Sequence, residues 1–197
     1  MKLSNKIVKF IHNNGGILKT SDFISLGYSK TTLGNYLKAG FLKKIAQGIY
    51  ILPKFEVCKY YELTFHSKTM VFSHETALYL NKLIEKEPIK YSITIPKNTM
   101  LTPYIKNQCN CFYVKPEIYK LGICGVKTPM NRIVACYDHE RTICDVFRSE
   151  KRVGERILIK ALKNYSKWRG KDLDKLYNYA KKFRIYKELR RYMILLT

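Results

Sequence analysis

Lysines without acidic neighbours stand among short polar residues in the stretch GYSKTTLGNYLKAGFLKKIAQGIYIL, residues 27–52. The lysines are Lys30, Lys38, Lys43 and Lys44, and no Asp or Glu occurs in the stretch to pair with them. Unpaired cations on a folded surface attract polyanions such as nucleic acids. The pattern therefore predicts binding of phosphate groups, with polar side chains close enough to contact bases.

The residues after Ser29 predict a helix that buries Leu33 and Leu37. Because successive helical residues are turned by about 100°, the other side of this helix faces solvent. That side carries Thr31, Gly34, Asn35 and Lys38. A helix that enters the major groove needs short side chains for close approach, an amide for a base edge and cations for phosphates. We therefore expect Asn35 to contact a base.

The predicted DNA-contacting residues extend from this helix to the segments on either side of it. The hairpin lysines would lie along the DNA backbone or in the minor groove. The full predicted set is Lys19, Thr20, Ser29, Lys30, Thr31, Thr32, Asn35, Lys38, Lys43, Lys44 and Gln47. The alternative is that this basic face contacts a protein, with Asn35 merely solvated.

A second basic surface is predicted near the end of the sequence. Residues 151–197 hold fifteen Lys or Arg against four acidic residues, and like charges at this density repel one another. The predicted surface comprises Arg152, Arg156, Lys160, Lys163, Lys167, Lys181, Lys182, Arg184, Lys187, Arg190 and Arg191. A polyanion would relieve the repulsion, so we expect this surface to bind DNA or RNA phosphates. Ordinary solvated helix faces are the alternative interpretation.

Composition supports a folded protein with a polyanionic partner. The chain of 197 residues is 46% hydrophobic and 13% aromatic, with a formal net charge of +22 and a pI near 9.8. No apolar run is long enough to span a bilayer, and residues 1–14 lack the continuous apolar stretch typical of a signal peptide. We therefore expect no membrane association, a cytoplasmic location and reduced thiols for the six cysteines.

Two His-Glu pairs, His74-Glu75 and His139-Glu140, are the residues with the greatest catalytic potential. Adjacent helical residues point in different directions, and neither pair is followed by the second histidine of a zinc-binding helix. We predict no catalytic residue, metal or cofactor. Glu140-Arg141-Thr142 is instead read as a first helical turn, with Arg141 bridging to a neighbouring strand. A nucleic-acid-processing enzyme, either a nuclease or a nucleotidyltransferase, is the alternative function.

These residues must be positioned by a helix–strand–helix–helix–hairpin arrangement within residues 1–53, which is the plan of a winged helix-turn-helix. The predicted helix caps are Ser4, Thr20 and Ser29, with Gly40 closing the third helix and Gln47-Gly48 turning the hairpin. Pro53 then suggests a boundary. The predicted fold class is α+β, with this first domain followed by a mixed α/β domain and a C-terminal helical bundle.

The second domain is predicted to span residues 54–197, with an α/β module at about 68–150 and the basic helical part at 151–197. A helix capped by Ser73 should continue to Leu83, and Asp138 should cap another. Strands are predicted at 91–95, 111–114 and 132–137, with turns at Gly122 and Gly125. Three further helices are predicted at 157–165, 173–183 and 185–196.

The stretch GGILKTSDFISLGYSKTTLGNYLKAGFLKKIAQGIYILP resembles the N-terminal winged domain of AbiEi antitoxins of type IV toxin–antitoxin systems. Downstream, SHETALYL, YSITIP and HERTICDVFR resemble the second domain of that family in the same order. The resemblance therefore covers nearly the whole chain. Each motif is loose alone, and their order and spacing are what make the resemblance specific.

The resemblance implies an autorepressor that binds inverted repeats in its own promoter through the winged helix. It also implies a phage-defence (abortive infection) role, in which the second domain counteracts a nucleotidyltransferase-like toxin without forming a stable complex. We expect a monomer in solution and two copies on DNA. A simple transcriptional repressor with no toxin partner is a further alternative.

Overall fold

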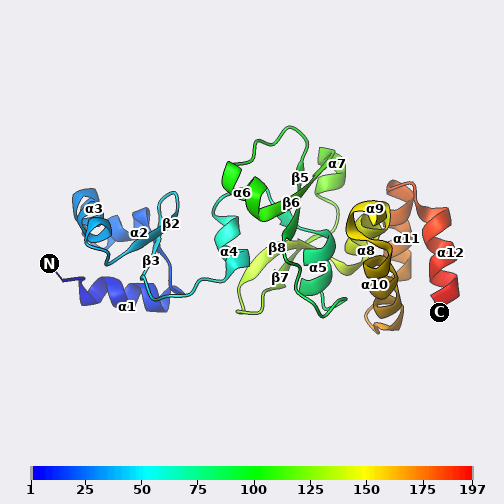
Figure 1. The fold of residues 1–197 in the computed structure, drawn as a ribbon, viewed down its shortest axis with the longest axis horizontal. Helices are drawn as coiled ribbons and strands as arrows, with labels where there is room; N and C mark the ends of the chain where they lie inside the picture. Colours follow the sequence, from blue (N-terminus) through cyan, green and yellow to red (C-terminus); the bar gives the residue numbers. More distant parts are fainter. Residues whose placement is uncertain (1, 197) are drawn as a thin grey trace. The chain divides into compact units, whose positions relative to one another are not determined.

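The computed structural model describes residues 2–196 and shows a mixed α/β protein built from two compact units (Figure 1). The first unit ends at Lys68 and the second begins at Thr69. Each unit has its own sheet.

From residue 2 onward, the first unit combines four helices with a small antiparallel sheet. Its helices are α1 (Asn5–Asn13), α2 (Thr20–Ser25), α3 (Lys30–Lys38) and α4 (Lys59–Thr64). Its strands are β1 (Leu18–Lys19), β2 (Lys43–Ala46) and β3 (Ile49–Ile51), in the order β1-β3-β2. The central strand β3 pairs with the other two, so β2 and β1 are the edges of this sheet.

Most of the predicted caps are confirmed. The hydroxyl oxygens of Ser4 and Ser29 accept hydrogen bonds from backbone N–H groups at the starts of α1 and α3. Gly40 has the left-handed conformation that ends a helix, with a φ of +71°. The prediction for Thr20 was wrong, because the preceding residue caps α2 and Thr20 is the first helical residue. The hydroxyl of Thr20 instead donates to the carbonyl of Gly48 at 3.4 Å.

The region between residues 54 and 68, which we assigned to the second domain, packs with the first unit. Val57, Tyr61 and Phe65 contact a small buried cluster beside the sheet. That cluster contains Ile17, Ala46, Ile49 and Ile51. Helix α4 went unpredicted because its polar, aromatic sequence has weak periodicity. Helix α4 belongs to the first unit because it packs on the buried cluster beside the sheet, which exists only once the sheet has folded.

The second unit is organised around a five-stranded mixed sheet in the order β6-β5-β4-β8-β7. The strands are β4 (Val71–Phe72), β5 (Tyr91–Pro96), β6 (Cys109–Val114), β7 (Ile123–Lys127) and β8 (Ile133–Tyr137). The three predicted strands correspond to β5, β6 and β8. Gly122 makes the predicted turn, with a φ of +77°, but Gly125 lies inside β7 opposite Ala135. The predicted turn at Gly125 was therefore wrong.

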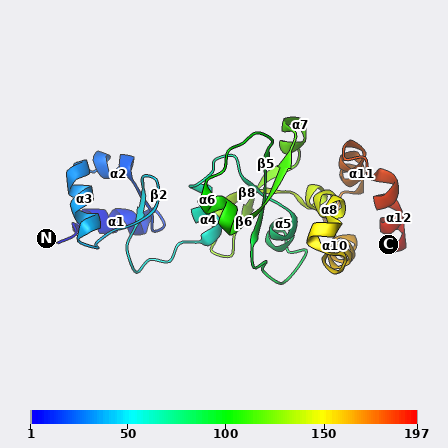
Figure 2. The same cartoon turned by 45° about the horizontal axis from the view of Figure 1, so that its top comes forward.

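Within the described part of the chain, eight helices of the second unit accompany this sheet. They are α5 (His74–Leu80), α6 (Pro103–Gln108), α7 (Pro116–Tyr119), α8 (His139–Arg148), α9 (Glu150–Val153), α10 (Glu155–Lys167), α11 (Leu173–Lys182) and α12 (Tyr186–Leu196). Helix α8 lies between α5 and α11 and contacts both (Figure 2). The predicted helix after Ser73 ends at Leu80, before Leu83, and the short helices α6 and α7 were not predicted.

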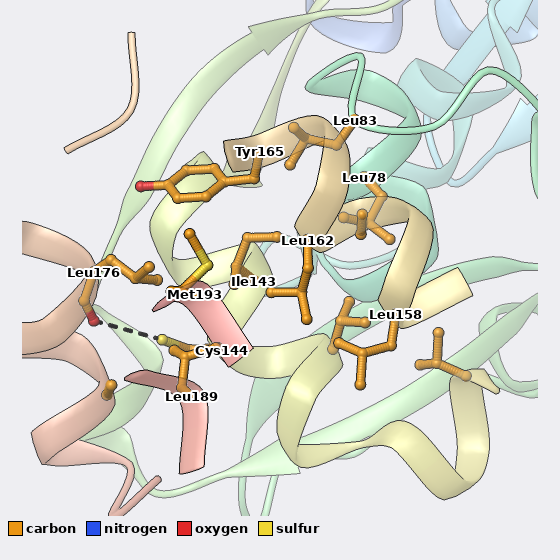
Figure 3. Packing of buried hydrophobic residues seen from close by; sticks show 14 of the residues in the cluster. Leu78, Leu83, Ile143, Cys144, Leu158, Leu162, Tyr165, Leu176, Leu189 and Met193 are labelled. Carbon is orange, nitrogen blue, oxygen red and sulfur yellow. Dashed lines mark hydrogen bonds between the residues drawn. The ribbon is translucent and has the colours of Figure 1, made fainter. Parts of the chain in front are cut away.

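A buried core of the second unit forms where α8 meets the C-terminal helices (Figure 3). Ile143, Leu162 and Leu189 come from three different helices and are almost fully buried. The thiol of Cys144 points to the carbonyl of Leu176, with a distance of 3.8 Å between sulfur and oxygen. Burial of such side chains contributes about 1.5–3 kcal/mol each. This core therefore fixes the helices that carry the second basic surface.

Candidate nucleic-acid interface

Helix α3 presents the face that the sequence predicted. Leu33 and Tyr36 retain only 4% and 6% of their exposure, whereas Asn35 and Lys38 are exposed. Leu37 is half-buried against the same core. The helix therefore has one apolar side that packs within the unit and one polar side that faces solvent, with Thr31 also exposed.

Gly34 has no structural reason within the protein to be glycine. A methyl group added at this position would meet no atom within 4 Å. Alanine would favour the helix by about 1 kcal/mol relative to glycine. The absence of a side chain at Gly34 therefore leaves the exposed face of α3 flat beside Asn35, at a cost to helix stability.

The polar groups of this face divide into free and engaged ones. Among residues 2–196, the side chains of Lys30, Asn35 and Lys38 make no hydrogen bond or ion pair. Ser29 and Thr32 are engaged with each other, because the Ser29 hydroxyl accepts from the Thr32 backbone N–H at 3.1 Å. Free cations and a free amide can bind an external partner without first losing an internal contact.

The β2–β3 hairpin follows α3 in the chain and carries exposed lysines. Lys43 and Lys44 are both exposed, and β2 is bulged between Lys44 and Ala46. The ammonium group of Lys44 donates to the amide oxygen of Gln47 at 2.9 Å, and this pair occupies the hairpin end. Lys19 is exposed at the start of α2, while Thr20 is half-buried. Thr20 and Thr32 are thus less accessible than the other predicted contact residues, which are exposed.

All eleven residues of the predicted second basic surface are exposed. They do not form one continuous helical stripe, because Gly154, with a φ of +96°, separates α9 from α10. Arg152 consequently lies in α9, with its guanidinium carbon 3.9 Å from the centroid of the Phe112 ring. Lys160 forms an exposed ion pair with Glu85 at 3.3 Å. The other side chains of the set make no ion pair within the described chain.

The His74 pair is part of a buried polar network. The His74 ring nitrogens lie 2.9 Å from the Ser73 hydroxyl and 3.1 Å from the Ser149 hydroxyl. The ring stacks on Phe112, with 3.4 Å between centroids. Burial lowers the pKa of His74 well below its usual value, and the nearby Arg152 charge adds to this effect. A neutral, enclosed imidazole of this kind links elements of the fold.

The second His-Glu pair also makes structural contacts. His139 stacks on Trp168 at 3.8 Å between ring centroids. Glu140 accepts a hydrogen bond from Tyr165 at 3.0 Å and forms an ion pair with Lys175 at 3.3 Å. The part of the chain from residue 2 to 196 contains no group of three or more His, Cys, Asp or Glu side chains placed to hold a metal ion.

Arg141 contacts a neighbouring strand as predicted, because its guanidinium carbon lies 4.0 Å from the centroid of the Tyr137 ring in β8. Its guanidinium donates to the carbonyls of Ile118 and Leu121, at 2.6 and 2.7 Å, which lie at the end of α7 and in the loop after it. The same group forms an ion pair with Asp145 inside α8. Over the described residues, no helix is long and apolar enough to cross a bilayer.

Residues 5–53 match a family model described as "Transcriptional regulator, AbiEi antitoxin". The match lies entirely within the first unit and confirms the AbiEi resemblance there. The domain that carries α3 and the β2–β3 hairpin is therefore of the type found in antitoxin transcriptional regulators.

The crystal structure of the RV2827C protein from Mycobacterium tuberculosis shares the fold, with a TM-score of 0.63 and 10% identity. The similarity covers 89% of this chain and 70% of that chain. The curated proteins include no match to this chain. At this level of identity, the structural similarity supports the mixed α/β fold across both units and carries no information about partners.

Proposed function

We propose that this protein is the antitoxin of a type IV toxin–antitoxin system and represses its own promoter. The first unit would act as a winged helix-turn-helix, with α3 in the major groove and the β2–β3 hairpin as the wing. The second unit, with its C-terminal helical bundle, would counteract a nucleotidyltransferase-like toxin. The proposed setting is the bacterial cytoplasm during phage defence, with two copies of the protein on the inverted repeats of the promoter.

The observation that carries this proposal is the exposed face of α3. It combines free lysines, a free amide and a glycine whose missing side chain nothing inside the protein requires. These properties suit a helix that approaches base edges closely. The match of this domain to antitoxin transcriptional regulators supports the same function. A face that binds a protein would not need a flat surface at Gly34. It would also not need lysines without any acidic residue nearby to pair with them.

Sequence reading by Asn35 can be tested by competition between operator and random DNA. Asn35→Ala should reduce the preference for operator by about 1–3 kcal/mol, because a bidentate base contact is lost. Lys43→Ala and Lys44→Ala should weaken both complexes similarly, because phosphate contacts carry no sequence information. Asn178→Ala changes an exposed asparagine on α11 and serves as the matched control. Unchanged discrimination in Asn35→Ala would contradict the placement of α3 in the groove.

The division of labour between units can be tested in cells that carry the toxin and a promoter reporter. A full-length chain with Asn35→Ala should still restore growth but lose repression. A chain with Lys181, Lys182, Arg190 and Arg191 changed to Glu should repress but fail to restore growth. Circular dichroism must first show that both variants are folded. Loss of both activities in each variant would contradict separate roles for the two units.

A further inference from the structure

An open hollow of about 440 Å³ in the second unit gathers positive charge from distant parts of the chain. Lys97 follows β5, Lys115 follows β6, and Arg148 ends α8. Lys182 and Arg184 come from the end of α11 and the turn after it. Among the described residues, no acidic side chain lines the hollow. Three of these cations, Lys97, Lys115 and Arg148, lie outside both predicted basic surfaces.

The five cations of this hollow lack anionic partners within residues 2–196. None of them forms an ion pair there, and Asp145, on the same helix as Arg148, is already bound by Arg141 at 3.0 Å. All five are exposed, and cations that line one concave site still repel one another. An anion of several charges would convert this repulsion into attraction.

Arg184 stands where the backbone favours glycine. Its φ is +59°, and it ends α11 in the hydrogen-bonding pattern that closes helices. The Arg184 N–H donates to Lys181 O at 3.1 Å, and the Ile185 N–H donates to Ala180 O at 3.0 Å. A glycine would adopt this conformation without strain. A need for the Arg184 guanidinium in the hollow would explain why arginine, and not glycine, occupies this position.

Two aromatic rings lie beside these cations, Phe183 in contact with Arg148 and Tyr113 in the lining of the hollow. The guanidinium carbon of Arg148 lies 4.7 Å from the centroid of the Phe183 ring, a contact that restricts where the arginine can point. Tyr113 lines the same hollow and keeps 47% of its exposure. An exposed tyrosine beside clustered cations can stack against a base while the cations hold phosphates.

We propose that this hollow binds a compact polyphosphate, either the triphosphate of a nucleotide or free inorganic polyphosphate. A triphosphate concentrates up to four negative charges in a small volume, which matches five converging cations. A nucleic-acid backbone presents one charge per phosphate, spread along an extended chain, and suits the more open rows of cations on α10 and α12. This site is separate from DNA binding by α3 and goes beyond the proposed function.

Calorimetric titration of the full chain with tripolyphosphate and with ATP, at physiological ionic strength, tests the proposal. We expect saturable binding at one site per chain. Arg184→Gly and Arg148→Gln should each weaken it by about tenfold, the effect of losing one charge-assisted hydrogen bond. Arg184→Lys, which keeps the charge, should retain most of the affinity. Because glycine suits the backbone at this position, Arg184→Gly should melt no lower than the unaltered chain, so a loss of binding cannot be attributed to unfolding.

Matched controls separate a built site from diffuse attraction. Arg191→Gln and Lys163→Gln change exposed cations outside the hollow and should alter the affinity less than twofold. Equal losses in all variants, or no saturable binding, would overturn the proposal. If ATP binds more tightly than tripolyphosphate and Tyr113→Ala removes the difference, the ligand is a nucleotide. Equal affinities for ATP and tripolyphosphate indicate free polyphosphate. A further competition uses an oligonucleotide without a terminal phosphate. If this oligonucleotide displaces ATP, and Arg184→Gly weakens its binding, the hollow binds nucleic acid and the proposal is overturned.

Discussion

Arg141 and Asp145 form a buried ion pair on one side of α8, with Arg141 Nε 3.0 Å from Asp145 Oδ2. Their side chains are 0% and 3% exposed. The guanidinium carbon also lies 4.0 Å from the Tyr137 ring centroid and 4.7 Å from that of Phe183. Burial raises the pKa of Asp145, and the Arg141 charge opposes that rise. One side chain thus joins α8 to β8, to the α7 loop and to the end of α11.

Replacing Arg141 should destabilise the second unit more than any exposed substitution. Arg141→Ala leaves Asp145 buried without its partner, which typically costs about 3–5 kcal/mol. Urea unfolding followed by the fluorescence of Trp168, the single tryptophan of the chain, reports on this unit. Arg148→Ala, on the same helix but exposed, should cost much less. A loss below about 1 kcal/mol in Arg141→Ala would mean that the pair contributes little net stability.

Acidic conditions should destabilise the second unit through His74. Because its pKa is lowered in the folded state, the unfolded chain binds the proton more readily. The stability associated with neutral His74 is therefore complete above about pH 6.5 and falls as the pH drops below that value. Urea unfolding between about pH 5 and 8 should show this slope.

A matched variant can assign that slope to His74. The residue has a φ of +47°, a conformation that asparagine tolerates. His74→Asn should therefore lower stability at neutral pH but flatten its dependence on pH. An unchanged slope in His74→Asn would show that other groups cause the acid sensitivity.

Gly34→Ala should separate stability from DNA affinity in the first unit. The added methyl group meets no atom within 4 Å, so the variant should be more stable by about 1 kcal/mol. If α3 enters a groove, the same methyl group should hinder close approach and weaken operator binding. Thermal unfolding by circular dichroism and DNA titration measure the two effects. Stronger or equal DNA binding in the more stable variant would contradict close approach at Gly34.

DNA binding should depend strongly on salt. If roughly six phosphates are neutralised, the affinity should fall about a thousandfold between about 50 and 200 mM monovalent salt. Lys43→Ala should reduce the slope of log affinity against log salt by about one. The comparison needs fluorescence anisotropy at several salt concentrations. A flat response would show that the exposed lysines of the first unit do not contact phosphates.

The sequence determined the local structure wherever a single segment carries its own signals. Ser4 and Ser29 cap helices as predicted, because an N-cap needs only a hydroxyl and the N–H groups a few residues on. The exposure of Asn35 and the burial of Leu33 also followed, because helical periodicity decides which residues share a side. Strands β5 and β8 were recognisable from their own alternation or β-branched composition.

Only the tertiary structure decided which distant residues meet. Strand β4 has two residues, too few for a pattern, and exists because it pairs with β5 and β8. Arg141 found its carbonyl partners in the α7 loop, and Lys97 and Arg184 came to share one hollow, although nothing in their local sequences indicates these contacts. Periodicity and capping act over a few residues, whereas such encounters depend on how the sheet and the helices pack. The positive charge of this protein could therefore be predicted from its sequence, but the gathering of five cations in one hollow could not.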